Sequence, residues 1–207
     1  MEPIRVINHI RNHFSPSMSH KQKWPSSSTQ FVVGGANESD QELLSTSQLL
    51  HKDFGLRRIY YSAFTPHQGT PFAAHAPVPS RREVRLYQAD FLIRDYGFSE
   101  NELAYDETGC LPLQKDPKMV WAERFLYDQP IEINQASREE LLRVPGIGPK
   151  HAQTILQFRK IRTITDLSFL KKIGVSTNRV KDFILLNGKL PTRQLSLFQL
   201  DHHQISI

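Results

Sequence analysis

The sequence predicts an α/β plus all-α protein, with an α/β region in its first half and a small helical domain in its second half. Two observations lead to this fold class. A strand, a helix and a second strand follow one another between residues 29 and 64, which is the pattern of a βαβ unit with a parallel sheet. Two similar glycine-containing turns, 28 residues apart, lie between short helical segments farther along the chain. The length of 207 residues is enough for two small domains.

The α/β region is predicted from alternating segments of the first half. Residues 1–28 are polar and rich in proline and serine, so we expect poor order there. Buried strands are expected at residues 29–35 and 58–64, separated by an amphipathic helix at residues 39–53. Parallel strands joined in this way have a right-handed crossover.

Two further helices complete the first half. Residues 80–96 carry apolar side chains at helical spacing and should cover the sheet. Another helix is expected from Pro117, because Asp116 is a good N-cap and proline suits the first helical position. The predicted organisation is a poorly ordered segment at 1–28, a partial α/β region at 29–130, a helical domain at 131–193 and a flexible tail at 194–207.

Composition excludes several classes of protein. A hydrophobic fraction of 39% and a charged fraction of 23% are typical of a folded globular chain, and no apolar run reaches the roughly 18 residues of a membrane helix. Charged residues among the first six exclude a signal peptide, so we expect a cytoplasmic protein. Cys110 is the only cysteine, and the nine histidines lack metal-ligand spacing. We therefore predict no metal site and assign no catalytic residue.

Positive charge is concentrated in the second half. Residues 134–193 contain twelve basic and four acidic residues, a net charge of +8, whereas the rest of the chain carries −3. A basic segment of this kind is typical of a domain that binds a polyanion. Charge alone is equally compatible with a solvated basic face that has no partner.

The strongest local signal begins at Ser137. Ser137 and Glu140 form a capping-box pattern that predicts a short helix, and a glycine-containing turn follows at residues 145–148. Pro149 suits the first position of a second helix. The pattern predicts a helix-hairpin-helix.

The turn of this hairpin has the features of a phosphate site. Gly146 and Gly148 permit backbone conformations that bring amides close to a ligand, and Ile147 should point into the core. The N-terminus of the second helix and Lys150 add positive charge on the same side. Because no side chain here is placed to read base edges, we expect sequence-independent binding to the backbone of duplex DNA.

A weaker copy of the turn follows at residues 173–176. Ser176 stands where the second glycine would be and Asn178 where the lysine would be, so this copy is expected to serve mainly as a packing partner. The pair resembles the tandem helix-hairpin-helix domains of DNA-repair and DNA-uptake proteins over residues 131–188, although such repeats also mediate protein contacts. The candidate DNA-binding residues are Gly146, Ile147, Gly148, Lys150, His151, Gly174, Ser176, Asn178 and Arg179.

Residues 30–40, 58–64 and 82–92 resemble the C-terminal third of a group of radical S-adenosylmethionine proteins in DNA modification and repair, distant relatives of spore photoproduct lyase. The resemblance implies that the α/β region is part of a radical-SAM-type (β/α) barrel. Residues 33–38 look like the family's adenine-contact motif, G-x-I-x-G-x-x-E, with Phe31 in place of the first glycine. The cofactor-binding residues implied by this resemblance are Gly34, Gly35 and Glu38.

The family's cluster-binding loop, C-x-x-x-C-x-x-C, is missing from this sequence. S-adenosylmethionine and a [4Fe–4S] cluster are therefore implied by the resemblance only, and we expect this chain alone to bind no cofactor and to have no enzyme activity. A complete barrel takes roughly 200 residues, about twice what precedes the hairpins. We also expect the strand at 30–33 to have an unpaired edge and the first half to be poorly packed unless another chain completes it.

The tail carries a short motif at residues 194–198. It resembles the pentapeptide by which bacterial replication and repair proteins dock on the DNA polymerase sliding clamp. Leu197 and Phe198 would fill an apolar pocket of the clamp, with Gln194 at its rim and Leu195 at a second contact. Alternatively, these side chains pack onto the helical domain.

Three functions are compatible with these patterns. The leading one is sequence-independent duplex DNA binding by the C-terminal part of a radical-SAM-like DNA modification or repair protein. The second is one half of a split radical SAM enzyme, whose cluster-binding half is a separate chain. The third is a protein-interaction adaptor that docks on the sliding clamp. No membrane partner is expected.

Overall fold

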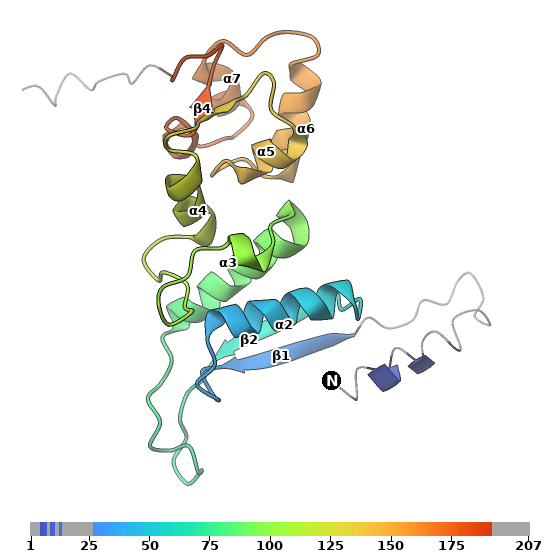
Figure 1. Cartoon of the computed structure of the whole chain (residues 1–207), viewed down its shortest axis with the longest axis vertical. Helices are drawn as coiled ribbons and strands as arrows, with labels where there is room; N and C mark the ends of the chain where they lie inside the picture. Colours follow the sequence, from blue (N-terminus) through green and yellow to red (C-terminus); the bar gives the residue numbers. More distant parts are fainter. Residues whose placement is uncertain (1–4, 8, 11–12, 14–26, 192–207) are drawn as a thin grey trace, which may run out of the picture. The chain divides into compact units, whose positions relative to one another are not determined.

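The computed structural model describes residues 5–7, 9–10, 13 and 27–191 (Figure 1). The described residues before residue 27 are helical. The elements that follow are β1 (Ser28–Val33), α2 (Asp40–Lys52), β2 (Arg58–Ala63), α3 (Ser80–Tyr96), the 3-10 helix η2 (Glu100–Glu102), α4 (Pro117–Phe125), β3 (Ile131–Glu132), α5 (Arg138–Arg143), α6 (Pro149–Phe158), α7 (Leu167–Lys172), α8 (Thr177–Val180) and β4 (Ile184–Leu185).

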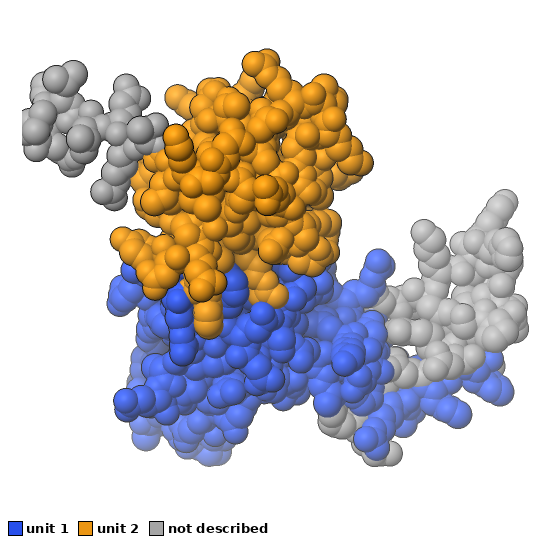
Figure 2. All heavy atoms as spheres, turned by 45° about the horizontal axis from the view of Figure 1, so that its top comes forward, with its two compact units in different colours: residues 1–124 blue, residues 125–207 orange. Residues whose placement is uncertain are grey.

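The chain divides into two compact units, Met1–Arg124 and Phe125–Ile207, which Figure 2 shows in different colours. The division falls within the last turn of α4. We refer to them as unit 1 and unit 2. Within the described part of the chain, no helix is both long and apolar enough to cross a membrane.

Unit 1 contains the predicted βαβ unit. β1 and β2 pair in parallel over six residues each, from Ser28 opposite Arg58 to Val33 opposite Ala63, and α2 lies between them in the chain. Helix α2 begins where its capping box requires, because Ser39 accepts a hydrogen bond from the Glu42 amide and the Glu42 carboxylate accepts one from the Ser39 amide. The predicted order of strand, helix and strand in this unit is therefore confirmed.

Helices α2 and α3 cover one face of the two-stranded sheet (Figure 1). Ile59 and Tyr61 of β2 are buried beneath the helices, whereas Tyr60 is 42% exposed on the opposite face and Val32 of β1 is 56% exposed there. Among the described residues, β1 and β2 pair only with each other, so they form no barrel. The sheet is therefore packed on one face and open on the other.

The core of unit 1 differs from the expectation of poor packing. Val33, Leu44 and Leu86 are fully buried between the sheet and the helices. Tyr61 adds a buried hydroxyl, which lies 2.6 Å from the Ser47 hydroxyl and donates to the Asp90 carboxylate. Burial and the nearby Asp90 carboxylate raise the pKa of Tyr61 far above its usual value. The two helices supply enough apolar surface for a core although the sheet has only two strands.

Unit 2 is not all-α, which corrects the predicted fold class. β3 and β4 pair in parallel, with Ile131 opposite Ile184 and Glu132 opposite Leu185, and they join the beginning of the unit to its end. Two residues are too few to show an alternating pattern, so the sequence contained no signal for this pair. The unit is a helical domain with a small strand pair, and the protein has mixed helix and strand structure in both halves.

Candidate nucleic-acid interface

The first hairpin consists of α5, a tight turn and α6. Ser137 caps α5, and its box partner Glu140 accepts a hydrogen bond from the Ser137 amide. The turn closes through a 3.1 Å hydrogen bond from the Ile147 amide to the Val144 carbonyl. Ile147 is 1% exposed, so the inward direction predicted for its side chain is confirmed. The turn is anchored in the core of unit 2 at its centre.

Gly146 is required in this turn by its backbone conformation. Its φ of +85° lies in the left-handed region, which favours glycine. A Cβ at this position would also lie 3.4 Å from the Cβ of Arg179 and 3.5 Å from Cγ1 of Val180. The close approach that we predicted toward a ligand is therefore, at Gly146, an approach to α8 of the second hairpin.

The beginning of α6 presents backbone amides without a side-chain cap. Gly148 is the N-cap and Pro149 the first helical residue, as predicted, and neither can cap the helix with a side chain. The first intrahelical bond runs from the Ala152 amide to the Gly148 carbonyl at 2.8 Å. The amides of Lys150 and His151 therefore precede the hydrogen-bonded part of the helix, and the exposed Lys150 side chain stands beside them.

His151 supports the turn from inside the hairpin. Its Nδ1 lies 3.2 Å from the Gly146 carbonyl oxygen, which can only accept, so Nδ1 carries the proton in this contact. The ring is half-buried, and Nε2 would lie 3.9 Å from a Cβ built on Gly174. His151, one of the predicted DNA-binding residues, thus lies between the two hairpins and supports the turn.

The second hairpin repeats this arrangement with α7 and α8. Gly174 has φ +88°, and Val175 is 3% exposed, so both keep the roles of Gly146 and Ile147. Ser176 is the N-cap of the four-residue helix α8, but its hydroxyl makes no capping hydrogen bond. Exposed Asn178 lies where the first hairpin has Lys150. Gly146 faces α8 and Gly174 faces His151 of α6, so the two hairpins pack against each other reciprocally.

Some polar residues of unit 2 have internal roles that the sequence did not reveal. Arg159 donates to the carbonyls of Ile133 and Ala136, so one of the basic residues counted in the +8 segment is used to hold the chain before α5. Asn134 donates to the Ile164 carbonyl and accepts from the Ile164 amide, both at 2.9 Å. No pattern around either residue indicated these contacts.

Comparison with known families agrees with this geometry. A family model for the helix-hairpin-helix motif matches residues 127–183. This segment is a helix-hairpin-helix. No curated protein and no solved structure matches the chain. The helix-hairpin-helix indicates nucleic-acid binding, and the matched segment contains both turns, at residues 145–148 and 173–176.

The helix-hairpin-helix lies in unit 2, whereas the predicted cofactor-binding residues lie in unit 1, in the loop after β1. The Glu38 carboxylate accepts hydrogen bonds from the amides of Gly34 and, at 3.0 Å, Ala36. Gly35 donates to the Val32 carbonyl at 3.2 Å, which closes a turn. The structure brings Gly34 and Glu38 together, and the carboxylate there serves the backbone of its own loop.

A cavity of about 660 Å³ adjoins this loop, and Gly34, Glu38, His75, Arg82 and Cys110 are among the residues that line it. Arg82 is held by the Asp40 carboxylate at 2.7 Å and by the Glu38 carbonyl. Among the described residues, no group of three or more His, Cys, Asp or Glu could hold a metal ion.

The clamp-like motif lies outside the described residues. Its residues Gln194, Leu195, Leu197 and Phe198 are all in the tail. Their docking on a sliding clamp stays a prediction.

Proposed function

We propose that the helix-hairpin-helix of this protein binds duplex DNA through backbone phosphates, without reading the base sequence. The observation that carries the proposal is the uncapped beginning of α6. Gly148 and Pro149 leave the first amides of the helix without a side-chain partner, and the exposed Lys150 adds a full charge within the same turn. The turn itself, residues 145–148, carries no polar side chain that could read base edges.

The packing of the turn supports the same proposal. Ile147 is buried and Gly146 lies against α8, so the turn is fixed before any ligand arrives. A preformed site loses little conformational entropy on binding. A phosphate would therefore meet amides already held in position.

The test is a fluorescence anisotropy titration of the full chain with labelled duplexes of unrelated sequence. We expect similar affinities for all of them and a slope of log K against log salt of roughly −3 to −4, which corresponds to about 3–5 phosphates. Lys150→Ala should reduce the magnitude of the slope by about one. Lys160→Ala is the matched control, because Lys160 is exposed beyond the opposite end of α6. Binding without salt dependence, or no binding by the wild-type chain, would contradict the proposal.

We propose, as a second function, that unit 1 belongs to a radical-SAM-like DNA modification or repair protein and forms its active assembly with a cluster-binding half. The observation that favours this proposal is the open face of the sheet. Val32 of β1 and Tyr60 of β2 are exposed there, although the two strands pair in parallel. Parallel sheets are normally covered on both faces or closed into barrels. The residues nearest an adenosyl group would be Gly34, Gly35 and Glu38.

Reconstitution with iron and sulfide under anaerobic conditions tests this second function. The chain alone should show no charge-transfer absorbance and no cleavage of S-adenosylmethionine, since its single thiol, Cys110, cannot hold a cluster. Addition of a chain that carries the three-cysteine motif should produce both signals and a stable complex. Cleavage by this chain alone, or no complex with such a chain, would contradict the assignment.

A further inference from the structure

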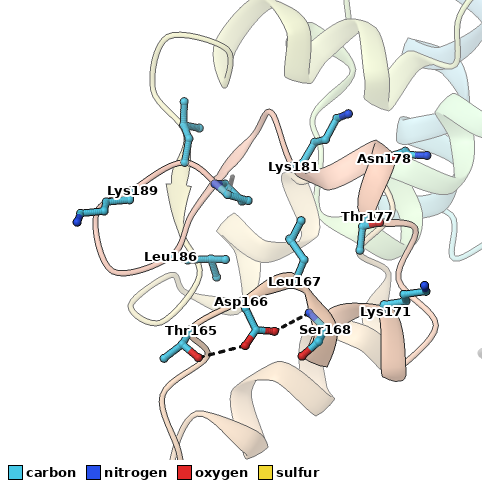
Figure 3. A pocket seen from close by; sticks show the side chains of 12 residues that line it. Thr165, Asp166, Leu167, Ser168, Lys171, Thr177, Asn178, Lys181, Leu186 and Lys189 are labelled. Carbon is cyan, nitrogen blue, oxygen red and sulfur yellow. Dashed lines mark hydrogen bonds between the residues drawn. The ribbon is translucent and has the colours of Figure 1, made fainter. Parts of the chain in front are cut away.

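A pocket of about 650 Å³ lies in unit 2 between the beginnings of α7 and α8 and the segment after β4 (Figure 3). We call it the basic pocket. Three lysines from three different segments line it: Lys171 at the end of α7, Lys181 directly after α8, and Lys189 after β4. Lys189 lies on the opposite side from the other two in Figure 3. The complete lining is Thr165, Asp166, Leu167, Ser168, Lys171, Thr177, Asn178, Lys181, Leu186, Lys189, Leu190 and Pro191.

The charge of the basic pocket is not neutralised by its own residues. Asp166 is the one carboxylate in the lining, and it accepts hydrogen bonds from the Ser168 amide at 2.7 Å and the Thr165 hydroxyl at 3.3 Å (Figure 3). These bonds lower the pKa of Asp166 by stabilising its charged form. Within the described residues, none of the three lysines makes an ion pair. Three lysines against one carboxylate therefore leave the rim of the pocket with an excess of positive charge.

Uncharged groups of the pocket narrow the choice of anion. Leu167 and Leu186 contribute apolar surface, while Ser168, Thr177 and Asn178 contribute hydrogen-bonding groups. A DNA strand offers both kinds of surface, because its deoxyribose edges are apolar and its phosphates are charged and accept hydrogen bonds. The pocket also continues into the second hairpin, since Thr177 and Asn178 belong to α8. A DNA strand bound at this hairpin would therefore also reach the pocket, because both lie in unit 2.

We propose that the basic pocket binds the phosphates of a DNA strand, so that the second hairpin contacts DNA through lysines instead of turn amides. This inference rests on the proposed DNA binding and deepens it. The first hairpin has Gln153 where the second has Lys181, and it has two glutamates at the beginning of α5, where α7 has no acidic residue in its first turn. The second hairpin thus has Ser176 and Asn178 at the positions of Gly148 and Lys150. It carries more lysines outside its turn than the first hairpin does.

The first test compares three variants of the full chain by anisotropy at several salt concentrations. K171A/K181A/K189A should reduce the magnitude of the salt slope by about two to three. R138A/K160A/K172A removes the same charge from exposed positions that do not line the pocket, and it should change the slope by less than one. K171R/K181R/K189R should keep the wild-type slope. Circular dichroism verifies that all three variants are folded.

The second test maps the lysines directly. Reductive methylation of the wild-type chain, followed by mass spectrometry, should show that a duplex protects Lys171, Lys181 and Lys189 more than Lys160 and Lys172. A poly-glutamate peptide or inorganic phosphate, each used in place of the duplex, should give the lysines little protection.

Each outcome has a distinct meaning. No DNA binding by the wild-type chain contradicts the proposed function itself. Wild-type binding with equal losses in the two alanine variants, or with no lysine protection, contradicts the pocket alone. Protection by the acidic peptide but not by the duplex would identify a protein partner, and equal protection by inorganic phosphate would identify a small-anion site; either result overturns the DNA assignment.

Discussion

The two hairpins of unit 2 share their architecture but differ in the residues that could meet a ligand. Gly146 and Gly174 both have φ near +85° to +88°, and the apolar residues after them, Ile147 and Val175, are both buried. The next positions diverge: Gly148 and Lys150 of the first hairpin correspond to Ser176 and Asn178 of the second. The residues that shape the turn are kept in both copies, whereas those suited to a phosphate are found in one.

This difference separates the requirements of packing from those of binding. A left-handed glycine followed by a buried apolar residue is needed for each hairpin to fold and to pack against the other. A glycine N-cap followed by proline and lysine is needed only where amides must remain accessible. The second hairpin is therefore a natural control for the first.

Truncation of the buried apolar side chain in the turn should have the largest effect on stability. Ile147→Ala should destabilise unit 2 by about 2–5 kcal/mol, because it leaves a cavity at a fully buried position. Val175→Ala should cost less, since it removes fewer methyl groups from the equivalent position. Chemical denaturation followed by circular dichroism gives both values. Equal losses of stability would mean that Ile147 and Val175 have more different surroundings than their equivalent positions suggest.

Substitution of the left-handed glycines should separate strain from crowding. Gly146→Val should destabilise by about 2–3 kcal/mol, because its Cβ would already touch Arg179 and Val180 and its methyl groups would add crowding to the backbone strain. Gly174→Val should cost about 1–2 kcal/mol from strain alone, as the nearest atom to a Cβ there is 3.9 Å away. Thermal unfolding of the two variants measures the difference. A larger loss at Gly174 would contradict the reciprocal packing described above.

Conversion of the second turn to the pattern of the first should increase DNA binding. The double variant Ser176→Gly with Asn178→Lys should steepen the salt slope by about one, since it adds a phosphate contact. Its stability should change by only a few tenths of a kcal/mol, because the Ser176 hydroxyl makes no cap. Ser176→Gly alone serves as the control that adds no charge. An unchanged slope in the double variant would indicate that the second turn faces away from DNA.

Acid should affect the second hairpin through its charged cap. Hydrogen bonds from Ser168 lower the pKa of Asp166, so the stabilisation is present above the ordinary aspartate pKa and is lost as the pH falls through the lower folded value. In the first hairpin the capping oxygen is the Ser137 hydroxyl, and the Glu140 carboxylate accepts a hydrogen bond from the Ser137 amide. As the pH falls from 5 to 2, the Ser168 amide should lose protection relative to its intrinsic exchange rate at the same pH. Asp166→Asn should remove this extra pH dependence, and its persistence in that variant would assign it to another group.

Local signals in the sequence determined where four helices of this protein begin. Ser137 with Glu140 forms the predicted capping box, Ser39 with Glu42 forms another, and Pro117 and Pro149 begin the predicted helices. These signals act between residues three or four positions apart, so their geometry is written in the chain itself. The parallel strand pair of unit 1 and the hairpin turn with buried Ile147 followed from the same kind of pattern.

Tertiary structure alone decided which groups meet across the chain. Asn134 contacts Ile164 and Asn187, 30 and 53 residues away, and β3 pairs with β4 although each has two residues. The space at Gly146 is filled by α8, and three lysines from separate segments surround one pocket. Such contacts depend on how the hairpins pack, since polar residues far apart in sequence carry no periodic signal that could pair them. The sequence by itself determined the hairpins and their charge, and only their packing decided which of those charges remain available to a ligand.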